Sequence, residues 1–215
     1  LKELDITIQS GISEIDGIKA TTYDFSKVSE SEIFALDLSV EQAQKDAILE
    51  AKNSHNSVGG VALINVKNAP IGLGEPLYFK LDSQIANAMM SINAVKAVEI
   101  GDGILASKVK GYDNNDQIRK DGFKTNHSGG ILGGISNGDD INVKVYFKAT
   151  PSIFIEQETV DVHNNEVNCQ LKGRHDPCVA VRGSVVAESM MALVLADMAL
   201  LNMSSKMENV KKVYS

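Results

Sequence analysis

Ile141-Asn-Val-Lys-Val-Tyr-Phe147 alternates apolar and polar side chains, which is the pattern of a β-strand with one buried face. Gly59 to Val66 is a run of small and β-branched residues that predicts a second, mostly buried strand. The alternation returns at Val167, Cys169 and Leu171 and predicts another half-buried strand. Residues 1–38 fit one or two strands followed by an irregular stretch.

Apolar residues three and four positions apart predict helices between and after these strands. The first helix begins at Ser39, which forms a capping-box pattern with Gln42, and its apolar face consists of Ala43, Ala47, Ile48 and Ala51. The second carries Leu81, Ile85, Ala88, Met89, Ile92 and Val95. The third, Val185 to Met203, is apolar nearly all round, so we expect it to be buried between other elements. Strands and long helices mixed without a strict βαβ rhythm favour the α+β class with an antiparallel sheet.

The composition excludes several classes of protein. The chain has 215 residues, of which 43% are hydrophobic and 23% charged, and we expect residues 1–215 to form a single globular domain. The net charge of −7 argues against a nucleic-acid partner. No apolar run approaches the ~18 residues that span a bilayer, so we expect no membrane partner. Cys169 and Cys178, with no second pair, argue against a metal site or a disulfide framework and suit a reducing cytosol.

The stretch from Thr125 to Gly138 is unusually rich in glycine, which stands at positions 129, 130, 133, 134 and 138. Glycine permits left-handed backbone and lets main-chain amides approach a ligand closely. The spacing fits neither the Walker motif nor the dinucleotide fingerprint. The loop is therefore either a tight connection or a cradle for an anion or a cofactor. His127, at its mouth, is expected to make a structural hydrogen bond rather than to act in catalysis.

Arg174, His175 and Asp176 stand in a row before Pro177. Proline biases the preceding residue toward an extended backbone, so Arg174 and Asp176 should point to the same side. The two side chains could form a phosphate clamp with an acid/base neighbour, or simply a surface ion pair.

Two more segments carry polar groups at the ends of predicted elements. Asn93 lies near the end of the second predicted helix, where it could cap the helix or hydrogen-bond a ligand ring. Lys148 ends a predicted strand ahead of Ala149-Thr-Pro-Ser152. A cation followed by hydroxyls could hold a phosphate, although a simple turn at the end of a strand would look the same.

Taken together, these segments resemble the chorismate synthase family. The similar motifs occur in the family's order, most convincingly from about residue 59 to 203: Gly72-Leu-Gly-Glu-Pro76, Met90-Ser-Ile-Asn-Ala-Val-Lys96, Val98-Glu-Ile-Gly-Asp-Gly103, Asn126-His-Ser-Gly-Gly-Ile-Leu-Gly-Gly-Ile-Ser136 and Gly173-Arg-His-Asp-Pro-Cys178. The resemblance implies a β-α-β sandwich of antiparallel sheets and long helices, assembled as a cytoplasmic homotetramer. It also implies a lyase of the shikimate pathway of aromatic amino acid biosynthesis, with an association with NADP. The implied reaction is the anti-1,4-elimination of phosphate from 5-enolpyruvylshikimate 3-phosphate to give chorismate, with reduced FMN as cofactor.

The resemblance also implies roles for individual residues. Arg174 would serve the phosphate of the flavin or of the substrate, and Asp176 would be catalytic, taking part in proton transfer near the flavin N5. Ala149 stands where the family usually has proline, so we expect a less rigid loop that still binds. The residues expected to bind FMN are Asn93, Ala94, Gly133, Lys148, Ala149, Thr150, Pro151, Ser152 and Arg174.

One part of the family pattern is missing from this sequence. The family's N-terminal region carries two catalytic histidines and several arginines that hold substrate and FMN, and none of those motifs occurs here. We therefore expect the C-terminal portion of such an enzyme, inactive alone and binding FMN weakly at best. Two alternatives are a flavin- or polyanion-binding fragment without catalysis and a purely structural oligomerisation domain. The latter explains the polar glycine-rich motifs poorly.

Overall fold

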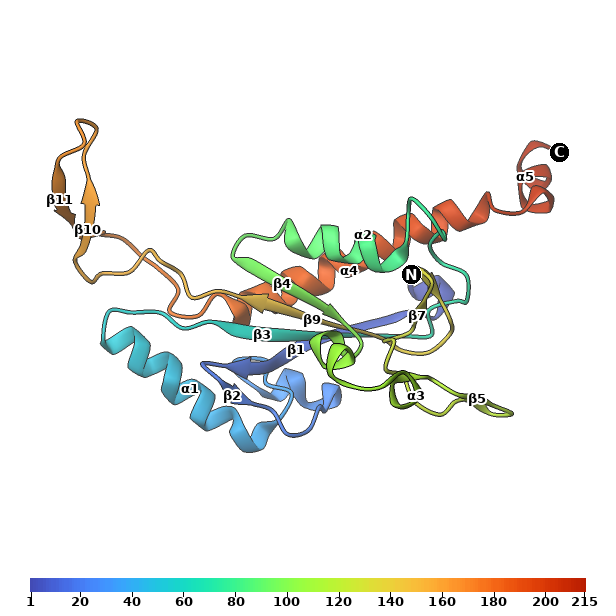
Figure 1. Ribbon diagram of the computed structural model, residues 1–215, viewed down its shortest axis with the longest axis horizontal. Coiled ribbons are helices and arrows are strands. Elements are labelled where there is room, and N and C mark those ends of the chain that lie inside the picture. Colours follow the sequence, from blue (N-terminus) through green and yellow to red (C-terminus); the bar gives the residue numbers. More distant parts are fainter.

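The computed structural model describes residues 1–215 and is built around one five-stranded sheet (Figure 1). The strands lie in the order β2-β1-β3-β9-β4, and every neighbouring pair is antiparallel. Their bounds are β1 (Thr7–Ile15), β2 (Ile18–Lys19), β3 (Gly60–Lys67), β4 (Val95–Ile100) and β9 (Ile141–Phe147). The predicted α+β class with an antiparallel sheet is confirmed.

Strand β9 shows the burial that its sequence predicts. Ile141, Val143 and Val145 are fully buried, while the residues between them are only partly covered. Strand β3 is buried along almost its whole length, as its run of small and β-branched residues requires. These two neighbouring strands therefore form the centre of the sheet and of the core.

Helices α2 (Leu81–Met90) and α4 (Ala180–Met203) lie on one face of the sheet, and α1 (Leu38–Asn53) lies on the other, beside β1 and β2 (Figure 1). The chain thus supplies one β layer with helices on both of its faces. The buried residues of α2 are Leu81, Ile85 and Met89, which are members of the predicted stripe.

The prediction for α1 was one residue late at its start and only partly right on its face. The helix begins at Leu38 because the side chain of Asp37 accepts a hydrogen bond from the Ser39 amide at 3.0 Å and caps the first turn. Its buried residues are Gln44 and Ala51, whereas Ala43 is exposed. Gln44 is buried because its side-chain amide donates to the Ile18 carbonyl at 3.0 Å, so a polar side chain occupies the place predicted for alanine.

The prediction that α4 is buried between other elements is also wrong. Met191 and Leu195 are fully buried, but Val186 is 47% and Leu193 66% exposed on the other side of the helix. The buried side packs on β1, β3 and α2. By length and composition α4 also passes as a membrane-spanning helix, contrary to the expectation from the sequence. The residues on one side of α4 are apolar because that side packs on the sheet, which explains them without a membrane.

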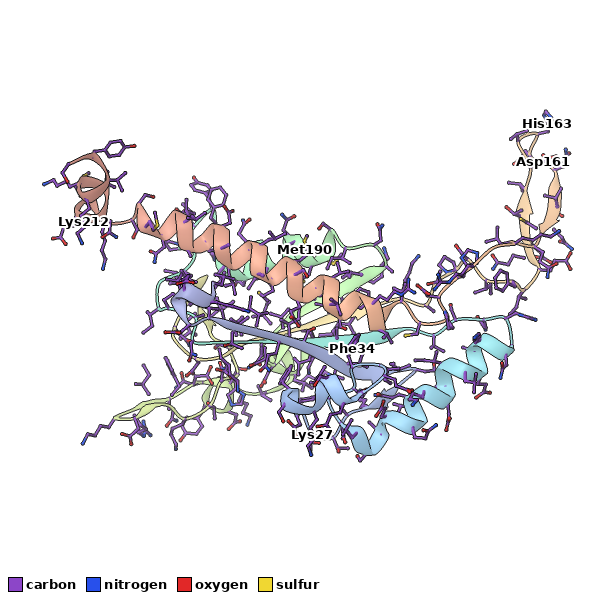
Figure 2. The ribbon with its side chains drawn as sticks, turned by 180° about the vertical axis from the view of Figure 1, so that it is seen from behind. Lys27, Phe34, Asp161, His163, Met190 and Lys212 are labelled. Carbon is purple, nitrogen blue, oxygen red and sulfur yellow. The ribbon has the colours of Figure 1, made fainter.

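Strands β10 (Gln157–Val160) and β11 (Glu166–Cys169) form a hairpin that projects from the body, with Asp161 and His163 near its tip (Figure 2). Every residue of both strands is exposed, so the predicted half-buried strand at 167–171 is wrong in its burial. No second layer covers this hairpin. The remaining elements are β5 (Ile118–Arg119), β6 (Gly122–Phe123), β7 (Ile131–Leu132), β8 (Ile135–Ser136), α3 (Gly111–Asn114), α5 (Met207–Tyr214) and the 3-10 turns η1 (Lys2–Leu4), η2 (Phe25–Glu30) and η3 (Gly103–Lys108).

Candidate functional site

The start of β4 and the end of β9 bring two predicted site segments together. Val95 pairs with Phe147 across the two strands, and the Lys148 amide donates to the Ala94 carbonyl at 2.9 Å. Asn93 and Ala94 are therefore direct neighbours of the Lys148 turn, although more than fifty residues separate them in the sequence.

The apolar spacing suggested that Asn93 belongs to helix α2, but Asn93 lies outside that helix. The helix ends at Met90, Ser91 is its C-cap, and the Ser91 hydroxyl donates to the Ala88 carbonyl at 2.6 Å. Asn93 lies in the turn that follows, and Ala94 adopts a left-handed backbone with φ 72°. Because the helix end is capped without Asn93, the amide of that side chain is not needed for capping.

A pocket of about 400 Å³ opens beside this turn, and we call it the Asn93 pocket. Its wall is mainly apolar and comes from the α2–β4 turn, β9 and the first turns of α4. Asp176 borders it, and an Asp176 oxygen lies 3.3 Å from the Arg182 guanidinium, with about a third of the carboxylate exposed. The lining residues are Ser91, Ile92, Asn93, Phe147, Asp176, Val179, Arg182, Gly183, Val186 and Met190.

The segment after Lys148 is held against the end of α1. The Ser57 hydroxyl donates to the Thr150 carbonyl at 2.7 Å, and the Gln157 side chain donates to the Pro151 carbonyl at 3.1 Å. Ser152 and Asp176 line a small hollow together. The hydrogen bonds to its carbonyls thus hold the Lys148–Ser152 turn near Asp176. The Lys148 ammonium and the Thr150 hydroxyl have no protein partner.

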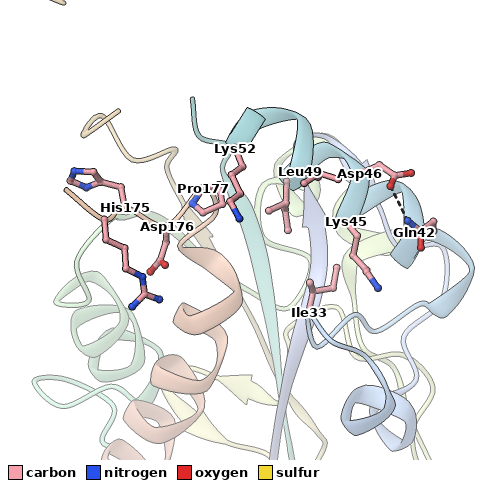
Figure 3. A pocket seen from close by; sticks show the side chains of 11 residues that line it. Ile33, Gln42, Lys45, Asp46, Leu49, Lys52, His175, Asp176 and Pro177 are labelled. Atoms are coloured by element: carbon pink, nitrogen blue, oxygen red, sulfur yellow. Dashed lines mark hydrogen bonds between the residues drawn. The ribbon is translucent and has the colours of Figure 1, made fainter. Parts of the chain in front are cut away.

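The Arg174-His175-Asp176 row does not form the ion pair that its sequence allowed. The carboxylate of Asp176 pairs with Arg182, and no carboxylate lies within 4.0 Å of Arg174. Arg174 lines a groove against α1 rather than the Asn93 pocket. Figure 3 shows this groove, with Lys52 of α1 on one side and His175 and Asp176 on the other. Asp176 lines both this groove and the Asn93 pocket, so it lies between the two.

Gly133 lies apart from the residues above. It is in the tight turn between β7 and β8, where its Cα faces open space, and the neighbouring Gly134 carbonyl accepts from the Leu81 amide at 2.8 Å. Leu81 begins α2 and Asn93 follows the end of α2. A ten-residue helix is about 15 Å long, so roughly that distance separates Gly133 from the Asn93 pocket.

The glycine-rich loop does cradle an anion, but the anion is the protein's own Asp116. That carboxylate accepts from the amides of His127 and Ser128 at 2.7 and 2.9 Å and from the Thr125 hydroxyl at 2.7 Å. Burial acts to raise the pKa of Asp116, but these donors outweigh it and hold the pKa below its ordinary value. The amides at the mouth of the loop are therefore not available to a ligand.

His127 makes the structural hydrogen bond that was expected. Its Nδ1 lies 2.6 Å from an Asp102 carboxylate oxygen, and the Asp102 amide donates to the His127 carbonyl at 2.8 Å. Next to this pair, a side chain on Gly101 would lie only 2.2 Å from the same carbonyl, and Gly101 has φ 58°. Glycine is required there because the two loops touch through their backbones.

Several residues of these sites were not found from the sequence. Phe147 was interpreted only as part of a strand, and Arg182 and Gly183 were not considered. The pairing of Asp176 with Arg182 could have been suspected from a cation six positions further on, at the start of an apolar helix. Nothing in the local sequence marks Asp116, because it lies in a polar loop. Asp102 was noted only as a member of the Val98–Gly103 motif, without a partner.

A model of the chorismate synthase family matches residues 1–200 of the chain. The chain belongs to that family. Over 214 residues it is 85% identical to a chorismate synthase of Aliarcobacter butzleri (strain RM4018) and 62% identical to one of Sulfurimonas denitrificans (strain ATCC 33889 / DSM 1251). A crystal structure of a chorismate synthase superposes with a TM-score of 0.78 at 30% identity, covering 99% of this chain and 62% of that one.

The match to each of these two relatives includes the whole of this chain. It spans 60% of the length of each relative. The resemblance found in the motifs is thus confirmed as membership of the chorismate synthase family.

Proposed function

We propose that this chain supplies part of the active site of a chorismate synthase. The complete enzyme would be a lyase that eliminates phosphate from 5-enolpyruvylshikimate 3-phosphate to give chorismate with reduced FMN. One observation carries this proposal: Asn93 and Asp176 meet in one pocket next to the Lys148 turn, although they come from two separate family motifs. A cytoplasmic homotetramer with a link to NADP belongs to the same proposal.

The residues at the Asn93 pocket fit the chemistry of a flavin. Phe147, Val186 and Met190 offer an apolar wall for a planar ring, and the Asn93 amide stands at its edge as donor and acceptor. The Lys148 ammonium and the hydroxyls of Thr150 and Ser152 suit a phosphate. Gly133 would reach the same ligand only if that ligand extended along α2.

FMN in its reduced form would supply electron density as phosphate departs and recover it as the hydrogen leaves, so the cofactor would carry the difficult step. The chain's own groups would bind, orient and move protons. Asn93 would hold the edge of the ring through its amide, and the left-handed backbone at Ala94 keeps the turn clear of it. Asp176, placed by Arg182 at 3.3 Å, would hold or accept a proton at the flavin N5.

The proposal is tested by FMN titration followed by an anaerobic chorismate assay, on the 215-residue chain and on the complete polypeptide where the natural protein is longer. In the complete polypeptide, Asn93→Ala should weaken FMN binding about 10-fold, because one hydrogen bond to the ring is lost. Asp176→Asn should reduce turnover by roughly 10²–10⁴-fold while FMN still binds. Asp82→Asn is the matched control, since Asp82 is a half-buried carboxylate at the start of α2 that accepts only from its neighbour's amide.

The reaction class would be wrong if the complete polypeptide bound FMN but made no chorismate, or if D176N and D82N had equal turnover. We expect the 215-residue chain alone to be inactive and to bind FMN weakly. Two observations favour a second function for the chain alone, that of a flavin- or polyanion-binding fragment. The chain covers 60% of the length of the relatives, and one side of α4 is exposed. Turnover by the chain alone would contradict it.

A further inference from the structure

The segment Leu171–Asp176 connects the β10–β11 hairpin to the start of α4 and makes no backbone hydrogen bond. The chain is held on either side of it. The Gln170 side chain donates to the Phe154 carbonyl at 2.7 Å, and the Val58 amide donates to the Pro177 carbonyl at 2.8 Å. Backbone hydrogen bonds therefore do not explain how the end of this segment is held at the Asn93 pocket.

One side chain of the segment is anchored by packing. Residues 171–174 are exposed, whereas His175 is half-buried and its Nε2 atom is fully enclosed. The edge of its ring packs against Phe154, with the ring centres 5.3 Å apart and the ring planes at 60°. Aromatic rings attract one another in such edge-to-face arrangements. The His175 ring is thus the main tether of the segment.

The surface that His175 packs against is itself fixed. The Phe154 amide donates to the His55 carbonyl at 3.1 Å, and the two rings pack edge to face with their centres 6.2 Å apart. His175 also lines the small hollow together with Ser57 and Ser152. The imidazole therefore fills the space between the end of α1 and the turn that follows β9.

Anchoring His175 also fixes the direction of its neighbour. Pro177 biases Asp176 toward an extended backbone, in which successive side chains point to opposite sides. Figure 3 shows the His175 ring and the Asp176 carboxylate pointing in different directions. The other tie of Asp176 is its 3.3 Å contact with Arg182, and Arg182 is 66% exposed. An ion pair as exposed as this one holds its partners only weakly.

We propose that His175 is a positioning residue, whose buried ring aims the Asp176 carboxylate at the Asn93 pocket. The inference rests on the proposed function, because it concerns how Asp176 reaches the flavin. No protein group bonds to the His175 Nε2 atom, so the contacts of the side chain use the shape of the ring rather than its nitrogen. Phenylalanine keeps a planar ring without a nitrogen, whereas alanine keeps neither.

The first experiment measures the order of the segment and does not depend on the reaction. Heteronuclear ¹⁵N relaxation is recorded on the 215-residue chain and its variants. In His175→Ala the amides of Arg174 and Asp176 should become as mobile as those of an exposed loop, because the tether is lost. In His175→Phe they should stay as ordered as in the parent chain. His163→Ala is the matched control, since His163 is exposed at the tip of the hairpin.

The second experiment measures turnover in the complete polypeptide where the natural protein is longer. H175A should lower kcat about 10- to 100-fold, because a small misplacement of a reacting group has an effect of this size, and should leave FMN affinity unchanged. H175F should keep most of the activity, and H163A all of it. Phe154→Ala should resemble H175A, although Phe154 does not line the Asn93 pocket. In the Asp176→Asn background, H175A should cost nothing further, because it acts through Asp176.

The inference is overturned if H175A leaves the amides of Arg174 and Asp176 as ordered as in the parent chain. It is also overturned if H175F lowers kcat as much as H175A while its circular dichroism is unchanged, since the nitrogen would then be the group that acts. Equal losses from H175A with and without D176N would overturn it as well. Failure of the proposed function is distinguishable, because the parent polypeptide would make no chorismate while the relaxation experiment still reported the anchoring.

Discussion

Replacing Gly183 by alanine gives the sharpest test of how α4 packs on the sheet. Glycine inside an exposed helix lowers stability by about 1 kcal/mol relative to alanine, so helix propensity alone predicts that Gly183→Ala stabilises the protein. The structure predicts the opposite sign. An alanine Cβ would lie 2.4, 2.5 and 3.0 Å from three ring atoms of Phe147.

The ring could move away only into the Asn93 pocket, which it lines. Phe147 is only 4% exposed and belongs to β9 at the centre of the core. Overpacking a close-packed site costs about 1–3 kcal/mol, which exceeds or cancels the gain in propensity. The net change is a loss of about 0–2 kcal/mol. For a chain of this size that corresponds to a decrease in Tm of up to about 6 °C.

Thermal unfolding of G183A would be compared with that of Gly111→Ala. Nothing lies within 4 Å of a side chain at Gly111, which begins the short helix α3, so its variant should be neutral or slightly more stable. Phe147→Leu should cost less in the G183A background than alone, because the two residues compete for one space. An increase in Tm for G183A would refute the reasoning, since it would show that the ring gives way without cost. FMN affinity would follow the same order if Phe147 forms the wall of the Asn93 pocket.

Three further predictions concern other regions of the chain. Burial, followed by the nearby Asp116 and Asp140, raises the pKa of Asp139. The ionised carboxylate therefore costs stability above its folded pKa, and Asp139→Asn should raise Tm at pH 7 but not near pH 3, where the carboxyl is protonated in both states. His127→Phe removes the 2.6 Å contact with Asp102 and should lower the free energy of unfolding in urea by about 1–3 kcal/mol, whereas Asp102→Asn added to it should cost little more. Leu195→Lys should abolish folding because Leu195 is fully buried, while Leu193→Lys, at a position 66% exposed, should leave the circular dichroism unchanged and reduce aggregation. If the two lysine variants behaved alike, the orientation of α4 would be wrong.

The sequence was most informative where one face of an element is buried and the other is not. The alternation at 141–147 gave β9 with its burial, because a period of two is visible in seven residues. The same alternation at 167–171 predicted a half-buried strand, but both faces of β11 are exposed because no second layer of structure covers it. In α4 apolar residues surround the helix, so the pattern could not say which side the sheet covers.

The candidate site depended on contacts that no local pattern encodes. Spacings of three and four continue past Met90 to Val95, so the sequence alone extended α2 over Asn93 and missed the turn. Asn93 and Lys148 become neighbours only because β4 pairs with β9. The family resemblance assigned these residues to one site together with Asp176, and the structure places Asn93 and Asp176 at one pocket. It did not reveal that Asp116 fills the mouth of the glycine loop or that Arg174 faces α1.

The β10–β11 hairpin has a consequence for how the chain is connected. It interrupts the polypeptide between the central strand β9 and helix α4, and all of its strand residues are solvent-exposed (Figure 1). A protease that nicks its tip near Asn164 would sever the backbone without breaking the contacts of α4 with β1 and β3. The two pieces should then stay associated on a sizing column and separate only in denaturant. This exposed tip is consequently the natural position for splitting the molecule into two complementing polypeptides.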